Sequence, residues 1–197
     1  MKDINKHLSF IIELDKLKAI YRKALVKLDK NRFENSAEHS WHTALAAKIL
    51  QQYAVEDIDI VRVMTMLLIH DIVEIDAGDL FAFSDEGDHA EQEAKEIAAA
   101  RRIFGLLPEN QSQHYQDLWF EFEKAESGDA RFAKAIDRIL PLLQNMNNDG
   151  GSWAQHKVSK SQVIKRNIYL KDLAPQLWLY VLAQIDLAVE NNWLINE

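Results

Sequence analysis

Apolar residues recur at helical spacing along most of the chain, and runs that alternate between apolar and polar residues are rare. In residues 3–29 the apolar positions return at steps of three and four, which predicts one amphipathic helix. This row consists of Phe10, Leu14, Leu17, Tyr21, Leu25 and Leu28. The same spacing predicts further helices over residues 37–53, 58–75, 89–107, 109–126, 129–147, 160–171 and 173–192. Gly and Pro interrupt helices, and they supply only 6 and 3 of the 197 residues, so the pattern predicts an all-α protein.

Polar residues mark where several of these helices should begin. Ser36, Asp57 and Asp129 each precede a predicted helix, where a side-chain oxygen can accept a hydrogen bond from a free backbone amide. Residues 29–36 are mostly polar and are predicted to be a link. The run Val63–Ile69 contains a single polar residue, so its helix should be buried nearly all round.

No repeat or low-complexity tract divides the chain. The turn at residues 147–153, with the sequence NNDGGSW, is the only plausible seam. We therefore expect residues 1–197 to form a single domain.

Charge and composition limit the classes of partner. The net charge is −8 and no Lys/Arg cluster is present, which makes long nucleic acid an unlikely partner and leaves room for a small anionic ligand. The N-terminal residues have no apolar core of a signal peptide, and no run of about 18 apolar residues could span a membrane. Together with the absence of Cys, these features lead us to expect a cytoplasmic protein.

The stretch LLIHDIVEIDAGDL, residues 67–80, attaches a histidine and several carboxylates to an apolar helix. At least one of His70 and Asp71 should point inward, because two leucines lie one turn before them. A buried ion costs several kcal/mol unless it is paired. No Lys or Arg lies between Arg62 and Lys95, so the partner must be a metal ion or a distant side chain.

Two distant segments offer metal ligands. His39 and His42 lie in the segment AEHSWH, and Asp137 lies on the apolar side of its predicted helix, where an unpaired Asp is unexpected. Pro141 removes the hydrogen bond to the carbonyl of residue 137, so the helix should bend beside this carboxylate. A set of two His and two Asp suits Mn, Fe, Co, Ni or Zn better than Ca.

These motifs, in the order AEHSWH, HD at residues 70–71 and AIDRI around Asp137, resemble the HD superfamily of metal-dependent phosphohydrolases. Their flanks are most similar to the bacterial branch that contains the HD-type 5′-deoxynucleotidases. The resemblance covers roughly residues 14–145 and implies an HD-type helical core. Residues 160–192 would add C-terminal helices to that core. It also implies a homodimer.

The resemblance implies a role for individual residues. The ligands of one divalent metal ion (Mn, Co, Fe, Mg, Ni or Zn) would be His39, His70, Asp71 and Asp137. Glu74 and Asp79 match acidic positions that serve catalysis and substrate placement. Arg22 matches a phosphate-contacting arginine, but Lys23 follows it where the characterised branch has Trp.

Residue chemistry adds further candidates for substrate binding. A guanidinium group is the expected fork for a phosphate, and Arg32 and Arg138 are candidates beside Arg22. His42 lies one helical turn from His39 and could contact phosphate or support a ligand.

The expected activity is hydrolysis of a small phosphate ester that depends on a divalent metal ion. A phosphomonoesterase that acts on (deoxy)nucleoside 5′-monophosphates fits the resemblance best. The alternatives are a phosphodiesterase or pyrophosphohydrolase that acts on another nucleotide, and a metal-containing nucleotide sensor without turnover. Glu74 and Asp79 beside a complete ligand set favour an enzyme over a sensor.

Overall fold

A computed structural model describes residues 2–197, and it is helical apart from one small hairpin. The principal helices are α1 (Lys2–Leu14), α2 (Ser36–Leu50), α3 (Ile60–Ile69), α4 (Glu74–Ala77), α5 (Glu86–Phe104), α6 (Glu109–Lys124), α7 (Gly128–Asn147), α8 (Gly151–His156), α9 (Lys160–Asn167), α10 (Leu170–Leu173) and α11 (Pro175–Glu190). Short 3₁₀ helices are η1 (Asp15–Ala19), η2 (Lys27–Asp29), η3 (Gln51–Tyr53) and η4 (His70–Val73). The prediction of an all-α class is confirmed as predominantly α.

The prediction of one long helix over residues 3–29 is wrong in its second half. The chain leaves α1 at Leu14 and forms the antiparallel strands β1 (Tyr21–Val26) and β2 (Arg32–Asn35), so the predicted polar link is a strand. The turn between the strands holds Lys30 and Asn31 at φ values of 54° and 59°, a left-handed conformation that suits a hairpin. Strand pairing therefore overrides a row of apolar residues that also fits helical spacing.

Helix beginnings lie one or two residues from their predicted positions. Asn35, and not Ser36, caps α2, and it forms a capping box with Glu38. Asp59, and not Asp57, caps α3, because its carboxylate accepts from the amides of the next turn. Likewise α7 is capped by Ser127 and not by Asp129.

The apolar helix predicted over residues 58–75 is divided into three parts. The α-helix α3 ends at Ile69, the tighter η4 carries the HD pair, and α4 follows. The side chains of Val61 and Leu68 are 70% and 48% exposed, so α3 is not buried all round as predicted. The change of helix type ends the apolar stretch just where the charged residues begin.

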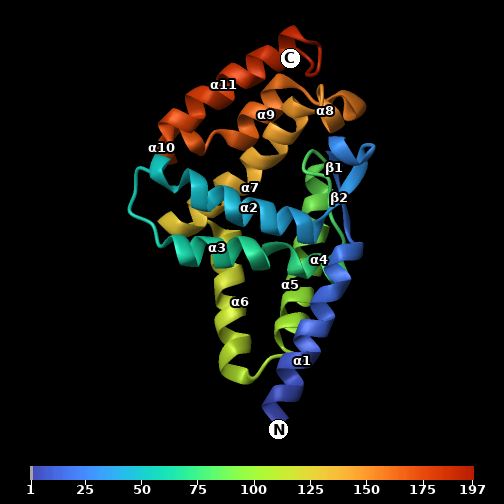
Figure 1. Ribbon diagram of the computed structural model, residues 1–197, viewed down its shortest axis with the longest axis vertical. Helices are drawn as coiled ribbons and strands as arrows, with labels where there is room; N and C mark the ends of the chain where they lie inside the picture. Colours follow the sequence, from blue (N-terminus) through green and yellow to red (C-terminus); the bar gives the residue numbers. More distant parts are fainter. Residues whose placement is uncertain (1) are drawn as a thin grey trace.

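Helices α2, α3 and α7 pack together in the middle of the molecule (Figure 1). Helices α1, α5 and α6 extend from one side of this centre, and α8 to α11 lie on the other side (Figure 1). The C-terminal helices share the same apolar core, because Val163, Leu170, Val181 and Ile185 are buried in it. Of these helices, α8 was not predicted, and the helix predicted over residues 160–171 is interrupted between α9 and α10.

The hairpin and the C-terminal helices meet the central helices at the same end of α7. Strand β1 contacts α7 and α8, and α9 contacts α7. Within residues 2–197, no helix is both long and apolar enough to cross a membrane. The fold therefore brings three sequence-distant regions to the side of α7 that carries Asp137.

Candidate metal centre

Three helices bring potential metal ligands together in the centre of the fold. His39 comes from α2, His70 from η4 and Asp137 from α7, and one ligand atom of each lies within 4.8 Å of the others. The His39 Nε2 atom is 2.9 Å and the His70 Nε2 atom 3.4 Å from Asp137 Oδ1. The sequence predicted that these three residues would meet, and they do.

A hydrogen bond to the backbone orients His70 for metal binding. The Nδ1 atom of His70 is 2.8 Å from the carbonyl oxygen of Leu67, a contact that places a proton on Nδ1 and makes Nε2 the nitrogen that would bind a metal. His70 Nε2 is buried without a hydrogen-bond partner in the described chain. An uncompensated buried nitrogen of this kind is satisfied by a metal ion, so the site fits one.

Buried polar groups support the ligands from behind. Glu34, on β2, is 3% exposed and places Oε2 3.3 Å from His39 Nδ1, while its Oε1 accepts from the amide of Gln144 at 2.6 Å. The indole of Trp119 donates to the carbonyl oxygen of His70 at 3.0 Å and fixes the turn of η4. A carboxylate behind a histidine ligand is typical of metal sites.

Asp71, the fourth predicted ligand, lies beside this cluster and also contacts Arg22. Its Oδ1 atom is 3.0 Å from His70 Nε2, and its Oδ2 atom accepts from Arg22 Nη1 at 2.7 Å. The carboxylate therefore lies next to the three ligands without belonging to the set within 4.8 Å. Its assignment as a ligand stays a prediction.

The charges of the cluster suit a divalent cation. Burial by itself would raise the pKa of Asp137, but the neighbouring imidazoles of His39 and His70 hold it well below its usual range. Burial disfavours the charged form of His70, but the carboxylates of Asp71 and Asp137 outweigh this effect and raise its pKa to about 9. A metal ion that binds here therefore displaces a proton from His70.

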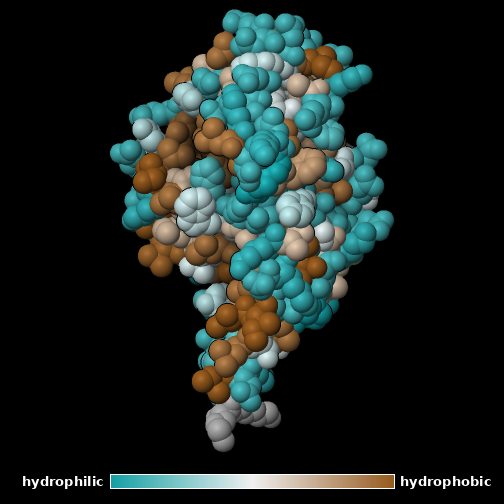
Figure 2. Space-filling view, turned by 45° about the vertical axis from the view of Figure 1, so that its right-hand side comes forward, coloured by the Kyte–Doolittle hydropathy of each residue, from teal (hydrophilic) through white to brown (hydrophobic). Residues whose placement is uncertain are grey.

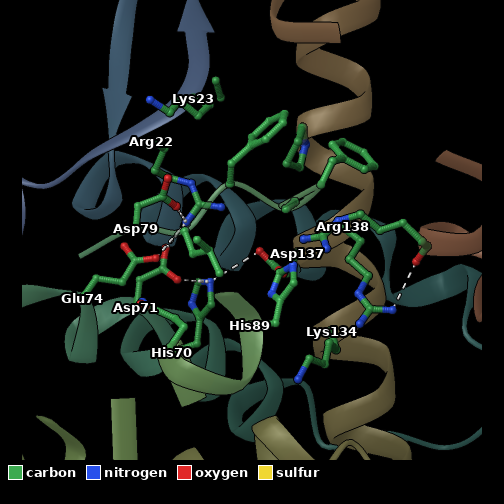
Figure 3. Close-up of a pocket in the computed structure, with 18 of the residues that line it drawn as sticks. Arg22, Lys23, His70, Asp71, Glu74, Asp79, His89, Lys134, Asp137 and Arg138 are labelled. Carbon is green, nitrogen blue, oxygen red and sulfur yellow. Dashed lines mark hydrogen bonds and ion pairs between the residues drawn. The ribbon is translucent and has the colours of Figure 1, made fainter. Parts of the chain in front are cut away.

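Glu74 and Asp79 lie beside the ligands and share Arg22. Arg22 Nη1 is 3.6 Å from Glu74 Oε1 and 3.7 Å from Asp79 Oδ1 (Figure 3). The hydroxyl of Ser36 donates to Glu74 Oε2. Burial and the charge of Asp71 raise the pKa of Glu74 well above its usual value. Burial also raises the pKa of Asp79. Two carboxyl groups that hold protons at unusually high pH are suited to acid–base chemistry.

A cavity of about 710 Å³ opens over this cluster. Its walls include Arg22, Lys23, Glu74, Asp79 and Asp137. Aromatic side chains also contribute to the walls; these are Phe81, Phe83, Trp119, Phe120, Phe122 and Trp153. The volume lies within the range of small-molecule sites, and it combines apolar walls with a few charged groups.

The structure separates the remaining candidates for substrate binding. Arg138 lines the cavity, and in Figure 3 it stands on the other side of Asp137 from Arg22. Arg32 lies outside the cavity walls, since its guanidinium is bound to Asp29 and to Glu38 on the exposed hairpin. His42 is also absent from the cavity walls and lies beside Trp41, with ring centroids 5.8 Å apart. Neither Arg32 nor His42 lines the cavity, and their role in substrate binding stays a prediction.

Three cationic residues of the cavity, Lys124, Lys134 and Arg166, were missed by the sequence analysis. Arg166, in the last turn of α9, lines the same cavity as Asp79 and Asp137. Its segment, KSQVIKRN, has the composition of an ordinary solvated helix and carries no motif. Only the packing of α9 against α7 turns this arginine toward the site.

Comparisons with known proteins identify the class that this fold and this cluster define. A family model described as HD domain matches residues 14–178. A crystal structure of a predicted metal-dependent phosphohydrolase from Magnetospirillum magnetotacticum is 47% identical, covers 98% of this chain and 95% of its own, and superposes with a TM-score of 0.91. An HD-domain phosphohydrolase from Listeria innocua is 17% identical, covers 92% of this chain and 85% of its own, and shares the fold with a TM-score of 0.59.

Curated relatives are more distant. The human 5′-deoxynucleotidase HDDC2 is 28% identical over 137 residues, which are 70% of this chain and 65% of the human protein. The relative of the same name from Dictyostelium discoideum is 25% identical over 146 residues, 72% of this chain and 76% of its own. The chain thus matches slightly less than two-thirds of the human protein's length.

The chain belongs to the HD-domain family. The relatives described above carry the names of phosphohydrolases and 5′-deoxynucleotidases, so the resemblance seen in the sequence and the expectation of a hydrolase are confirmed at the level of the family.

Proposed function

We propose that this protein is a divalent-metal-dependent phosphomonoesterase that releases phosphate from (deoxy)nucleoside 5′-monophosphates. The observation that carries the proposal is the pair of buried carboxyl groups, Glu74 and Asp79, which both lie within 4 Å of Arg22 Nη1 beside the His39–His70–Asp137 cluster. A site that only senses a nucleotide has no need for two such acids. The 5′-deoxynucleotidases among the relatives support the choice of substrate.

The ligands would be His39, His70, Asp137 and Asp71. A divalent ion bound there would polarise the phosphoryl group and lower the pKa of bound water. Glu74 would accept a proton as water attacks phosphorus, and the bond between phosphorus and the ester oxygen would break. Asp79, whose pKa is also raised, would give a proton to the departing ester oxygen. The products are a nucleoside and inorganic phosphate.

Lys23 bears on the choice of sugar. It lines the cavity directly after Arg22 and places its ammonium 5.8 Å from the centre of the Phe33 ring. The resemblance puts Trp at this position in the characterised deoxynucleotidases. A flexible lysine excludes a 2′-hydroxyl less strictly than an indole does, so we propose that ribonucleotides are also accepted.

Phosphate release from a panel of deoxy- and ribonucleoside 5′-monophosphates tests this proposal. The protein would be stripped of metal and reloaded with Mn²⁺, Co²⁺, Mg²⁺, Fe²⁺, Ni²⁺ or Zn²⁺. We expect metal-dependent release that Asp71→Ala and Glu74→Ala both abolish, with metal still bound to Glu74→Ala. The absence of release from every monophosphate, with metal bound stoichiometrically, would overturn the proposal. Release from diesters or pyrophosphates would then identify those substrates, and binding without turnover would identify a sensor.

We also propose that the protein is a homodimer and that it is located in the cytoplasm. Exposed apolar residues follow one face of α1, where Figure 2 displays an apolar patch near the tip of the molecule; they are Ile4, Leu8, Ile11 and Ile12. A second row on α2 consists of Trp41, Leu45 and Ile49, which recur at every fourth residue. Exposed apolar rows of this kind mark contacts between proteins. Light scattering after size-exclusion chromatography should give twice the mass of the chain, and a monomer at micromolar concentration would contradict the dimer.

A further inference from the structure

The charged side chains of the cavity are unevenly engaged. Arg22 contacts three carboxylates, with its Nη1 atom 2.7 Å from Asp71 and less than 4 Å from two further acids. Arg138 also has partners, because its Nη1 donates to the carbonyl oxygen of Arg166 at 3.1 Å and its guanidinium lies 4.6 Å from the centre of the Tyr169 ring. Both groups are therefore held in place by the protein.

The guanidinium of Arg166 differs from the other two. Among the side chains that the structure describes, no carboxylate forms an ion pair with it, and no side-chain hydrogen bond holds it. It is half-buried and lines the cavity that contains Asp79 and Asp137. Burial and the nearby charges of Arg138 and Arg22 lower the pKa of Arg166, while Asp137 and Asp79 oppose this effect. A cation with these neighbours, and without a partner of its own, is suited to binding an anion.

We propose that Arg166 binds the phosphate group of the substrate, and that Arg138 is a positioning residue that holds the last turn of α9 so that Arg166 faces the metal centre. This inference rests on the proposed function only in naming a phosphate ester as the anion. It assigns a part of the site to the C-terminal helices, which carry no family motif. A guanidinium group presents paired N–H donors that match two phosphate oxygens.

The charge of the cavity agrees with this assignment. Seven Asp or Glu side chains and six Lys or Arg side chains line the cavity, among them Arg166, so its formal charge is −1 when all are ionised. A divalent cation changes this to +1, and a phosphate dianion returns it to −1. Without Arg166 the occupied cavity would carry −2, so phosphate binding should weaken substantially.

The test measures binding of inorganic phosphate to the metal-loaded protein by titration calorimetry, and product inhibition by phosphate and by nucleoside where turnover is observed. For Arg166→Gln we expect affinity for phosphate to fall about 10- to 100-fold, the loss typical of one hydrogen bond to a charged group. Arg166→Lys keeps the charge but not the paired donors, so it should recover part of the loss. Affinity for metal and inhibition by nucleoside should not change.

Arg101→Gln is the matched control, because Arg101 is an exposed arginine of α5 outside the cavity walls. It should leave phosphate affinity within twofold of the unaltered protein. The inference is overturned if Arg166→Gln also stays within twofold, if it weakens nucleoside and phosphate equally, or if the unaltered protein binds no phosphate. Phosphate binding that depends on Arg166 in a protein that hydrolyses no monophosphate would overturn the proposed function and leave this inference standing.

Discussion

Two buried serines on α2 offer a controlled test of Glu74 as the catalytic base. Ser36 is fully buried, and its hydroxyl donates to Glu74 Oε2. Ser40, one turn further along the same helix, is 3% exposed, and its hydroxyl has no partner in the described chain. Changing either one to Ala removes the same hydroxyl from the same helix, but only the change at Ser36 removes a hydrogen bond to Glu74.

The hydrogen bond from Ser36 lowers the pKa of Glu74 and so opposes burial and the charge of Asp71, which raise it. A hydrogen bond to a charged group contributes about 1.5 to 3 kcal/mol. Because about 1.4 kcal/mol corresponds to a factor of ten, Ser36→Ala should lower kcat/KM on the acidic limb by about 10- to 100-fold and raise the pKa of Glu74 further. The base must be ionised to accept a proton, so the acidic limb of the rate profile should move to higher pH.

The assay is kcat/KM for phosphate release between pH 5 and 9 (roughly the range over which such a base titrates) at saturating metal. Ser36→Ala should shift the acidic limb upward with metal affinity unchanged, and Ser40→Ala should leave the limb in place. Ser40→Ala should also keep or slightly increase stability, since it removes an unpaired hydroxyl. Superimposable profiles for Ser36→Ala and the unaltered protein, or equal shifts for both variants, would refute the role of Glu74 as the base.

Three further predictions concern stability. Removal of metal with a chelator should lower the free energy of unfolding by about 2.7 kcal/mol. The reference is protein in a metal concentration one hundred times the dissociation constant, and denaturant titration with and without metal measures the difference. Burial raises the pKa of Glu96 from 4.5 to about 7, which means that the folded protein favours the protonated carboxyl group. The stability of the fold that depends on this proton is fully present below pH 4.5 and is lost as the pH rises through about 7. Glu96→Gln should therefore flatten the pH dependence and add about 1 kcal/mol at pH 8 after allowance for solvent screening, and unchanged unfolding midpoints at pH 5 and 8 would contradict this. Lys30→Gly should stabilise the hairpin by about 0.5 to 1 kcal/mol because Lys30 has a φ of 54°, and a fall in the thermal midpoint would show that this conformation is not the source of strain.

Two members of the metal cluster, His70 and Asp137, could be singled out because each is anomalous in its own helix, and the family resemblance added His39. A histidine after seven mostly apolar residues, and an aspartate on the apolar side of α7, have unfavourable positions unless something binds them. These anomalies are local and can be read without knowledge of the fold. The structure then brings His39, His70 and Asp137 together from three helices.

The hairpin could not be predicted in the same way. Its turn uses Lys30 and Asn31 in a left-handed conformation that is usually signalled by Gly, and its apolar residues also fit a helical row. The side chain of Leu28 is 99% exposed, although helical periodicity placed it on the buried face. The pairing of β1 with β2 is a non-local interaction, and it decides the outcome here.

Only some of the residues predicted to bind substrate line the cavity, because tertiary packing, and not position in the sequence, decides which side chains face it. Arg32 and His42 are close in sequence to the ligands but point elsewhere, whereas Arg166 is distant in sequence and lines the cavity. An arginine on a polar helix has the same sequence signature whether it faces solvent or a site. Only the packing of α9 on α7 distinguishes these two cases.

The candidate metal ligands and several side chains proposed to bind substrate lie on different parts of the fold. The ligands lie on the central helices α2 and α7 and on η4, whose positions are fixed by the shared core. Arg22 and Lys23 come instead from β1, and Arg166 comes from α9; these elements approach α7 from the hairpin and from the C-terminal helices. Changes at Lys23 or Arg166 can therefore alter which phosphate ester binds without moving the metal ligands. If this reasoning holds, Lys23→Trp should raise the ratio of deoxy- to ribonucleotide hydrolysis while metal affinity stays constant, and a parallel loss of both would show that β1 supports the metal centre itself.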